Sequence, residues 1–218
     1  MKSFSATECV DYGWRTFKLR PWFLVMATII MLTIAWIVST INMEAGKGFV
    51  QMFAISIAAL IVQTLVDMGL TNFALKAGDD VDSVELSDLW YPHSFWNFLI
   101  AIFPVGVAIV LGLVAFIIPG VILALMFFFV KFLIIDRDMA PIEAMKESIR
   151  ITKGHRFELL VFLLLIIALN VVGLACFGVG LLVSLPVSSL AMVRAYRLLE
   201  HEASELVPMT VSVTVLEV

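Results

Sequence analysis

The uncharged stretch Ser94–Val130, which reads SFWNFLIAIFPVGVAIVLGLVAFIIPGVILALMFFFV, decides the fold of this chain. The hydrocarbon core of a bilayer is about 30 Å thick, and about 20 apolar helical residues are needed to cross it. The 37 residues of this stretch are therefore too many for one crossing and just enough for two. Gly112 and the Ile118-Pro119-Gly120 motif lie near its middle, and Gly and Pro interrupt helices. The stretch predicts a tight helical hairpin in a membrane.

Three further uncharged stretches extend this pattern: Pro21–Met43, Gly48–Val66 and Leu159–Val193. The first two predict one crossing each. The third predicts a second hairpin, because Gly173 and Gly178-x-Gly180 lie near its middle. We therefore predict an all-α integral membrane protein whose membrane domain, residues 21–200, contains six transmembrane helices, the last four as two hairpins broken by Gly and Pro. A re-entrant arrangement of each hairpin stays open, provided that its turn is shielded by protein.

The composition agrees with a membrane protein. Of 218 residues, 62% are hydrophobic, and the mean hydropathy is +1.07, whereas soluble domains are roughly 45–50% apolar. No small-x-small cleavage site follows Pro21–Met43, so we expect this stretch to stay as a transmembrane helix rather than to be removed as a signal peptide. The two cysteines are far apart in the sequence and predict no disulfide framework.

The distribution of Lys and Arg predicts the orientation. Of the 14 basic residues, only Lys47 falls on one side of the predicted topology. The other 13 are Lys2, Arg15, Lys18, Arg20, Lys76, Lys131, Arg137, Lys146, Arg150, Lys153, Arg156, Arg194 and Arg197. Cytoplasmic segments of membrane proteins carry an excess of Lys and Arg. We therefore predict a multi-pass protein of the cytoplasmic (inner) membrane with both termini in the cytoplasm.

Three short amphipathic helices are expected on the cytoplasmic side. The first lies in the N-terminal segment 1–20, at about Ala6–Lys18, where Ser5 and Glu8 have the spacing of a capping box. The second lies near residues 83–90, with Asp82 and Glu85 at the same spacing.

The third amphipathic helix is expected at 141–153, where Pro141 suits a first helical turn and Gly154 suits the stop. Ile142, Met145 and Ile149 form its predicted apolar stripe. Such helices lie in the headgroup region or cap the transmembrane helices, and the two are compatible. The basic residues expected to meet anionic membrane lipids are Arg15, Lys18, Lys146, Arg150 and Lys153.

Two polar residues inside the apolar stretches are the candidate functional residues. Asp67 follows the second stretch, and ionisable groups at membrane depth are costly and often mark a pathway. Asn170 lies inside the last stretch, where a hydrogen bond between helices explains it adequately. No cluster of chemically active residues has the spacing of an active site or metal site, so we predict no catalytic, cofactor-binding or metal-binding residues.

Five carboxylates lie close together after the second crossing: Asp79, Asp80, Asp82, Glu85 and Asp88. We expect either a solvated turn or pairing with Lys146 and Arg150 of the third amphipathic helix. A divalent-cation site is a further alternative, although the spacing matches no calcium loop.

The C-terminal segment 201–218 is a predicted cytoplasmic tail. Val211, Val213 and Val215 alternate with Thr and Ser, which is the period of a strand. Because a lone strand has no partner in this chain, we hypothesise that the tail adds a strand to a partner protein or to a second copy of the chain. The alternative is a loosely held tail.

A set of motifs carries a resemblance to a known family. They are Ile118-Pro119-Gly120, Ile135-Asp136, Pro141-x-Glu143-Ala144-x-Lys146-x-Ser148, Thr152-Lys153-Gly154, Gly173, Gly178-x-Gly180, Pro186 and Ala195-Tyr196. Over residues 5–200 the chain resembles uncharacterised bacterial six-helix membrane proteins related to the membrane domain of some glycerophosphodiester phosphodiesterases. The resemblance implies the membrane fold and a bacterial cytoplasmic membrane. It implies no catalytic residues, because the catalytic barrel of those relatives needs far more soluble chain.

The sequence therefore leads to a non-enzymatic integral membrane protein that acts as a scaffold or accessory subunit of a membrane assembly. The alternative is a transporter or channel for a small solute or lipid, which broken helices favour. An enzyme acting on lipid is a third reading, for which no cluster of active residues is found. The expected partners are membrane lipids and a protein bound through the tail, with no nucleic acid.

Overall fold

The computed structural model describes residues 4–44, 49–176 and 178–216. Within these ranges every regular element is a helix and none is a strand, which confirms the all-α prediction. The elements are α1 (Ala6–Leu19), α2 (Pro21–Glu44), α3 (Phe49–Asp79), the 3₁₀ helix η1 (Leu86–Leu89), α4 (Phe95–Ala115), α5 (Ile117–Met126), α6 (Val130–Arg137), α7 (Pro141–Thr152), α8 (Arg156–Ala175) and α9 (Leu181–Leu216).

Five helical stretches of the described chain are long and apolar enough to cross a membrane. They are Phe53–Asp79, Phe95–Ala115, Ile117–Arg137, Arg156–Ala175 and Leu181–Glu205. A sixth is counted if α2 is taken together with α1, from which it is bent by 100°. The chain is therefore a multi-pass membrane protein with five or six spans. Lys47, the basic residue predicted on the opposite side, lies outside the described residues.

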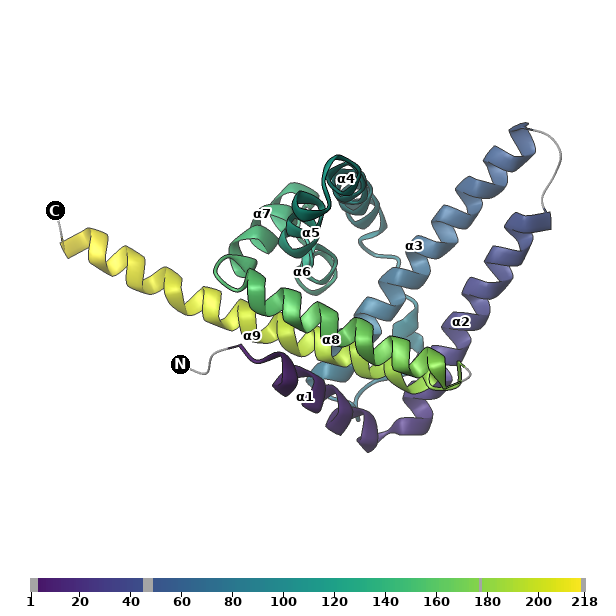
Figure 1. Cartoon of the computed structure of the whole chain (residues 1–218), viewed down its shortest axis with the longest axis horizontal. Coiled ribbons are helices and arrows are strands. Elements are labelled where there is room, and N and C mark those ends of the chain that lie inside the picture. The colour runs from purple at the N-terminus through teal and green to yellow at the C-terminus, as the bar shows by residue number, and fades with distance from the viewer. Residues whose placement is uncertain (1–3, 45–48, 177, 217–218) are drawn as a thin grey trace.

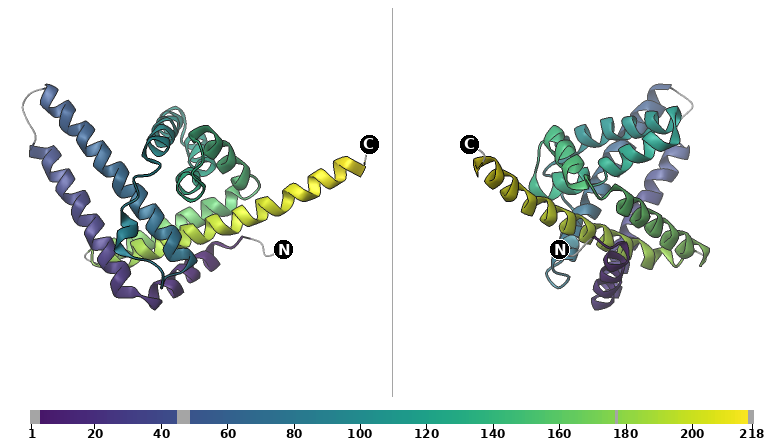
Figure 2. Two further views of the ribbon diagram at one scale, coloured as in Figure 1. Left: turned by 180° about the vertical axis from the view of Figure 1, so that it is seen from behind. Right: turned by 60° about the vertical axis from the view of Figure 1, so that its left-hand side comes forward.

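The spans are arranged as helical hairpins (Figure 1). The α2–α3 pair rises away from the α8–α9 pair, and α4 to α7 lie above α8 in this view. In the right-hand view of Figure 2, α2 leads into α3 and α8 leads into α9 on one side of the molecule. The C-terminal part of α9 lies toward the other side. The turns of these two hairpins therefore share a side of the molecule.

Glycine pairs close the two hairpins that the sequence predicts. A Cβ atom on Gly112 would lie 2.9 Å from the Cα of Gly120, and one on Gly180 would lie 2.5 Å from the carbonyl oxygen of Gly173. Only glycine permits such an approach of two helix backbones. Both hairpins are thus confirmed, and the bulk of any side chain at these positions would force the helices apart.

The break between α5 and α6 is held by α7. The Ser148 hydroxyl donates to the Met126 carbonyl oxygen at 2.8 Å and accepts from the Phe129 N–H at 3.3 Å. These backbone groups lack helical partners at the break, so a buried hydroxyl satisfies them. The buried face of α7 therefore runs through Ala144, Ser148 and Ile151. The predicted apolar stripe was displaced, since Ile142 is 67% exposed.

The N-terminal amphipathic helix forms as predicted and packs along α9 (Figure 1). Cys9, Gly13 and Phe17 form its buried face. Ser5 occupies the N-cap position, but its hydroxyl lies 3.0 Å from the Thr7 hydroxyl and makes no capping bond. The sequence predicted that this helix lies in the headgroup region or caps the transmembrane helices. The structure shows the second arrangement, in which α1 packs against α9.

The predicted helix over 83–90 was wrong, because only one 3₁₀ turn, Leu86–Leu89, forms there. The side chains of Glu85 and Asp88 cap this turn reciprocally. From α3, the Asn72 amide donates to the Asp88 carbonyl oxygen at 2.8 Å. The segment is thus bound to the surface of α3 over its short length, which leaves no room for a free amphipathic helix.

The predicted strand in the tail was also wrong. α9 continues through Leu216, so Val211, Val213 and Val215 lie in a helix that crosses the predicted boundary at 200/201 without a break. A helix satisfies its backbone hydrogen bonds within its own segment, whereas an isolated strand leaves them to another chain. Continuation of α9 is the arrangement that this chain achieves alone.

Candidate functional site

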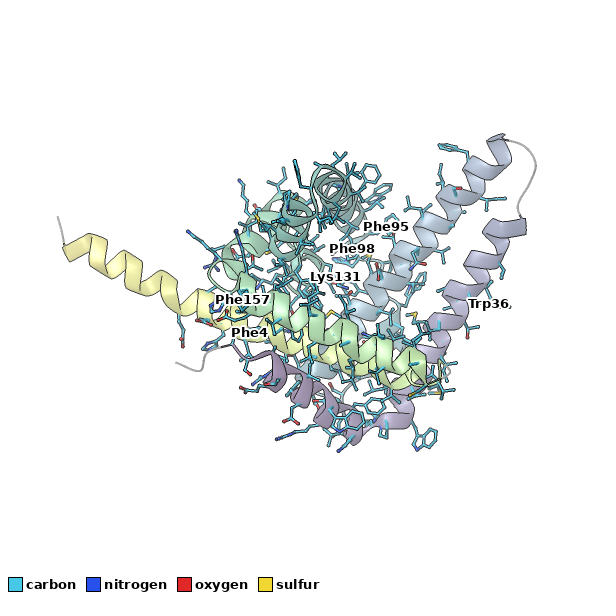
Figure 3. All side chains as sticks on the ribbon, viewed as in Figure 1. Phe4, Trp36, Phe95, Phe98, Lys131 and Phe157 are labelled. Atoms are coloured by element: carbon cyan, nitrogen blue, oxygen red, sulfur yellow. The ribbon has the colours of Figure 1, made fainter. Side chains whose placement is uncertain are left out.

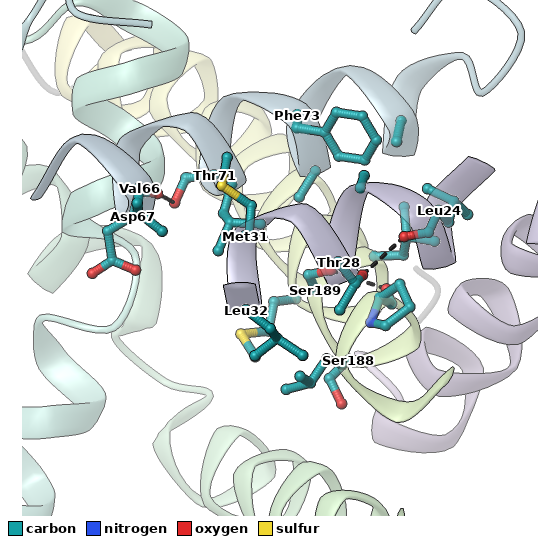
Figure 4. A pocket seen from close by; sticks show the side chains of 18 of the residues that line it. Leu24, Thr28, Met31, Leu32, Val66, Asp67, Thr71, Phe73, Ser188 and Ser189 are labelled. Atoms are coloured by element: carbon teal, nitrogen blue, oxygen red, sulfur yellow. Dashed lines mark hydrogen bonds between the residues drawn. The ribbon is translucent and has the colours of Figure 1, made fainter. Parts of the chain in front are cut away.

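A cavity of about 340 Å³ lies between α2, α3, α6, α8 and α9. This volume is within the range of roughly 300–1,000 Å³ typical of small-molecule sites. Most of its wall is apolar, with Leu24, Met31 and Leu32 from α2 and Val66 and Phe73 from α3. Figure 4 shows these side chains facing a space that residues of α9 close from the other side. The three hairpins thus leave an apolar hollow where they meet.

The structure places both predicted polar residues on this wall. Asp67 comes from α3 and Asn170 from α8, and the two are separated by about a hundred residues in the sequence. No pattern within either sequence segment predicts that these two residues line the same cavity. A functional role for either residue stays a prediction. The two residues differ in how many hydrogen bonds their side chains make.

Asn170 is fully engaged inside the α8–α9 hairpin. Its Nδ2 donates to the Ile166 carbonyl oxygen at 2.9 Å and to the Ser188 hydroxyl at 3.0 Å. Its Oδ1 accepts from the Ser184 hydroxyl at 2.9 Å. Because these bonds join α8 to α9, Asn170 is explained as an interhelical contact, as the sequence indicated.

Asp67 is different, since its carboxylate has no hydrogen-bond or ion-pair partner among the described residues. The Thr71 hydroxyl donates at 2.8 Å to the backbone oxygen of Asp67, not to its side chain. α3 continues twelve residues beyond Asp67, about 18 Å of helix. Asp67 therefore lies within the helix rather than at its end, where the sequence placed it.

Lys131 is the site residue that the sequence reasoning missed. It is the second residue of α6, it lines the same cavity, and it is partly buried. Figure 3 labels it near the middle of the view. Its Nζ lies 5.3 Å from the centre of the Phe132 ring, and no carboxylate of the described chain lies within 4.0 Å of it. A signal was present, because Lys131 directly follows the longest uncharged stretch. It was counted only as one more cytoplasmic cation.

The predicted interfacial basic residues lie outside the cavity. On α1, Arg15 pairs with Asp11 at 2.7 Å, and the Lys18 ammonium lies 5.1 Å from the Trp14 ring centre. Both groups are held against neighbours on the same helix. Contact of Arg15 and Lys18 with lipid stays a prediction.

On α7, the Arg150 guanidinium donates to both Glu147 carboxylate oxygens at 2.6 and 2.8 Å, and to the Ala203 carbonyl oxygen at 3.0 Å. The first of these contacts holds the pKa of Glu147 below its usual value, although partial burial opposes the shift. Lys146 and Lys153 are exposed. These two lysines are thus available to a membrane surface.

The predicted pairing of the acidic segment with α7 was wrong. Asp88 pairs with Lys76 at 2.5 Å, and Asp79 pairs with Arg197 at 2.7 Å. The reason is packing, because the end of α3 lies against α9. The carboxylate at that end therefore meets a guanidinium of α9 before any residue of α7.

Arg197 is the centre of an ion network that joins α3, α6 and α9. Its guanidinium donates to both oxygens of Asp136 at 2.7 and 2.8 Å and to Asp79 at 2.7 and 3.1 Å. Glu200 lies 3.5 Å away and also pairs with Arg137. Every charge in this network has a partner, which is the arrangement expected of a structural clamp.

Metal-site geometry is absent from the described part of the chain, since no three His, Cys, Asp or Glu side chains gather closely enough to hold an ion. No protein-family model, curated protein or solved structure matches the chain. The resemblance given above therefore stays a prediction. The function is inferred from the cavity itself.

Proposed function

We propose that this protein is a non-enzymatic membrane protein that binds and handles an amphiphile, in the class of membrane lipids, inside the cavity between α2, α3, α6 and α9. This proposal rests on an apolar cavity of about 340 Å³ that is lined by the carboxylate residue Asp67 and the ammonium residue Lys131. Neither side chain has an ion-pair partner among the described residues. Of the two functions that the sequence left open, handling of a solute or lipid fits this geometry better than a scaffold.

The lining favours an amphiphile over an ion or a polar solute. A polar solute needs hydrogen-bonding groups around most of its surface, whereas this wall is mostly aliphatic. Leu32 lines the cavity and is also 42% exposed, so the cavity reaches the apolar outer surface of α2. That surface would face acyl chains in a membrane. A lipid could therefore enter sideways without crossing a polar barrier.

The setting of this function is the bacterial cytoplasmic membrane, with both termini in the cytoplasm. The excess of Lys and Arg on the side of the termini supports the orientation. The exposed Lys146 and Lys153 would lie near the negatively charged lipids of the inner leaflet. The bacterial assignment is supported by the family resemblance alone.

Filling the cavity tests the proposal. Ala35 lines the cavity, so Ala35→Phe should displace a bound lipid. Ala58, exposed on α3 and outside the cavity wall, offers the matched control Ala58→Phe. Each protein would be purified in mild detergent and its bound lipid counted by native mass spectrometry. One lipid retained by the wild type and by A58F but lost from A35F is the expected result, and equal retention by all three proteins would contradict the proposal.

A scaffold role is the second candidate, favoured by α9. This helix runs for 36 residues, and its C-terminal part projects beyond the other helices (Figure 1). A partner would then meet a helix at Val211, Val213 and Val215 rather than a strand. Deletion of residues 207–218 tests this role. Loss of a stoichiometric partner that copurifies with the full chain would support it, and an unchanged particle would count against it.

A further inference from the structure

We infer that the cavity selects a zwitterionic phospholipid headgroup, with the phosphate at Lys131 and a primary ammonium group at Asp67. This inference rests on the proposed function and names the class of its ligand. It follows from the pairing state of the two charged residues and from the chemistry of the wall around them.

The two charges do not neutralise each other directly. Among the described residues neither side chain has an ion pair within 4.0 Å, although both line the same cavity. Asp67 is exposed and Lys131 is partly buried in the structure, and both belong to helices that are apolar enough to cross a membrane. An unpaired charge beside hydrocarbon is costly. A ligand that supplies one counter-charge to each residue removes both costs at once.

Only a zwitterion meets that requirement. An anionic lipid such as phosphatidylglycerol would satisfy Lys131 through its phosphate and leave Asp67 unpaired. A cationic amphiphile would satisfy Asp67 and leave Lys131 unpaired. A headgroup with a phosphate and an ammonium group matches both residues, and its acyl chains continue along the apolar wall at Met31 and Leu32.

The carboxylate also favours a primary ammonium over a quaternary one. A primary ammonium donates hydrogen bonds, and charge-assisted bonds of this kind are about twice as strong as neutral ones. A quaternary ammonium has no N–H group and offers the carboxylate only its charge. We therefore expect phosphatidylethanolamine to bind more tightly than phosphatidylcholine, and phosphatidylcholine more tightly than phosphatidylglycerol.

The test uses the full chain in mild detergent with an equimolar mixture of these three lipids and diacylglycerol, all with the same acyl chains. Native mass spectrometry reports which lipid is retained. For the wild type we expect about tenfold preference for phosphatidylethanolamine over phosphatidylglycerol, the effect of one hydrogen bond between charged groups. Asp67→Asn should bring this ratio close to one. Lys131→Gln should reduce the preference for all three phospholipids over diacylglycerol, which has no phosphate.

Matched controls alter exposed charges outside the cavity. Glu143→Gln on α7 and Lys76→Gln on α3, whose side chain is 52% exposed, should leave both preferences at the wild-type values. If D67N and K131Q keep the wild-type preferences while A35F still loses its lipid, the headgroup assignment is overturned and the proposed function survives. If A35F keeps its lipid, the cavity is not the binding site and both fall.

Discussion

Two groups of charges in this protein differ in a way that separates structure from function. At one end of α3, Arg197 is surrounded by Asp79, Asp136 and Glu200, so every charge has a partner. Further along α3, Asp67 lines the same cavity as Lys131, and neither has an ion-pair partner among the described residues. Paired charges stabilise the contact between helices. Unpaired charges at an apolar cavity cost stability, and we propose that a ligand compensates them.

The largest expected effect is on the paired group. Arg197→Leu would leave Asp79 and the mostly buried Asp136 without a cation, whereas Glu200 would keep its pair with Arg137. Removing one partner of a buried ion pair costs about 3–5 kcal/mol, and we expect about 3 kcal/mol here because Asp79 stays half exposed.

Thermal unfolding in detergent should show this loss as a melting temperature lowered by about 5–10 °C. The control Arg15→Leu breaks an ion pair in which both side chains are more than half exposed, so its melting temperature should stay near that of the wild type. Equal melting temperatures for R197L and R15L would show that the network does not clamp the helices.

The next largest effect is expected at Asn170, which lines the cavity but whose side chain is hydrogen-bonded to protein groups. Asn170→Leu would remove the bonds to Ser184 and Ser188 between α8 and α9. Hydrogen bonds between transmembrane helices contribute about 0.6 kcal/mol on average and up to about 1.7, so we expect a loss of about 1 kcal/mol. Thermal unfolding measures it. If N170L is as stable as the wild type but loses its bound lipid, Asn170 contributes to ligand binding rather than to the contact between α8 and α9.

A smaller effect is expected from the pair on α7. The Arg150 guanidinium holds the pKa of Glu147 below its usual value of 4.5, so the pair stabilises the fold above that pH. The stabilisation is lost as the pH falls through the lowered pKa. Between about pH 5 and about pH 3, the melting temperature of the wild type should therefore fall more steeply than that of Glu147→Gln. Parallel curves for the two proteins would contradict this.

The smallest effect on stability is expected at the cavity. Asp67→Asn and Lys131→Gln break no ion pair of the described chain and each removes an unpaired charge, so neither should lower the free energy of unfolding. Because Asp67 is exposed and Lys131 only partly buried, we expect a gain of at most about 0.5 kcal/mol. Differential scanning fluorimetry in lipid-free detergent measures this. A drop of several degrees in either variant would indicate that the two residues pair with protein groups, and the distinction between the two regions would disappear.

Much of the fold could be predicted from the lengths of the uncharged stretches and the positions of Gly and Pro within them. The lengths of the uncharged stretches predicted the spans, and the Gly-rich breaks predicted the two hairpins that Gly112 with Gly120 and Gly173 with Gly180 close. These predictions rest on local quantities: the thickness of a bilayer and the bulk of one side chain. The predictions near 83–90 and at Val211–Val215 failed, because periodicity in a short segment does not report which neighbour holds it.

The candidate site was only half predictable. Asp67 stood out as a carboxylate beside an apolar stretch, whereas Lys131 was grouped with the other cytoplasmic cations. Asn170 was correctly explained as an interhelical contact, although its partners on α9 were not foreseen. Which charges are paired depends on the packing of α3 against α6 and α9, and no pattern within one segment contains that information.

The sequence by itself determined that the chain lives in a membrane and that its helices form hairpins, because hydrophobic length and backbone bulk act within each segment. The tertiary structure decided which polar residues meet. It paired Asp79 with Arg197, 118 residues apart, and left Asp67 and Lys131 on the wall of one cavity. The physical reason is that charges interact through space, and only the packing of the hairpins sets their distances.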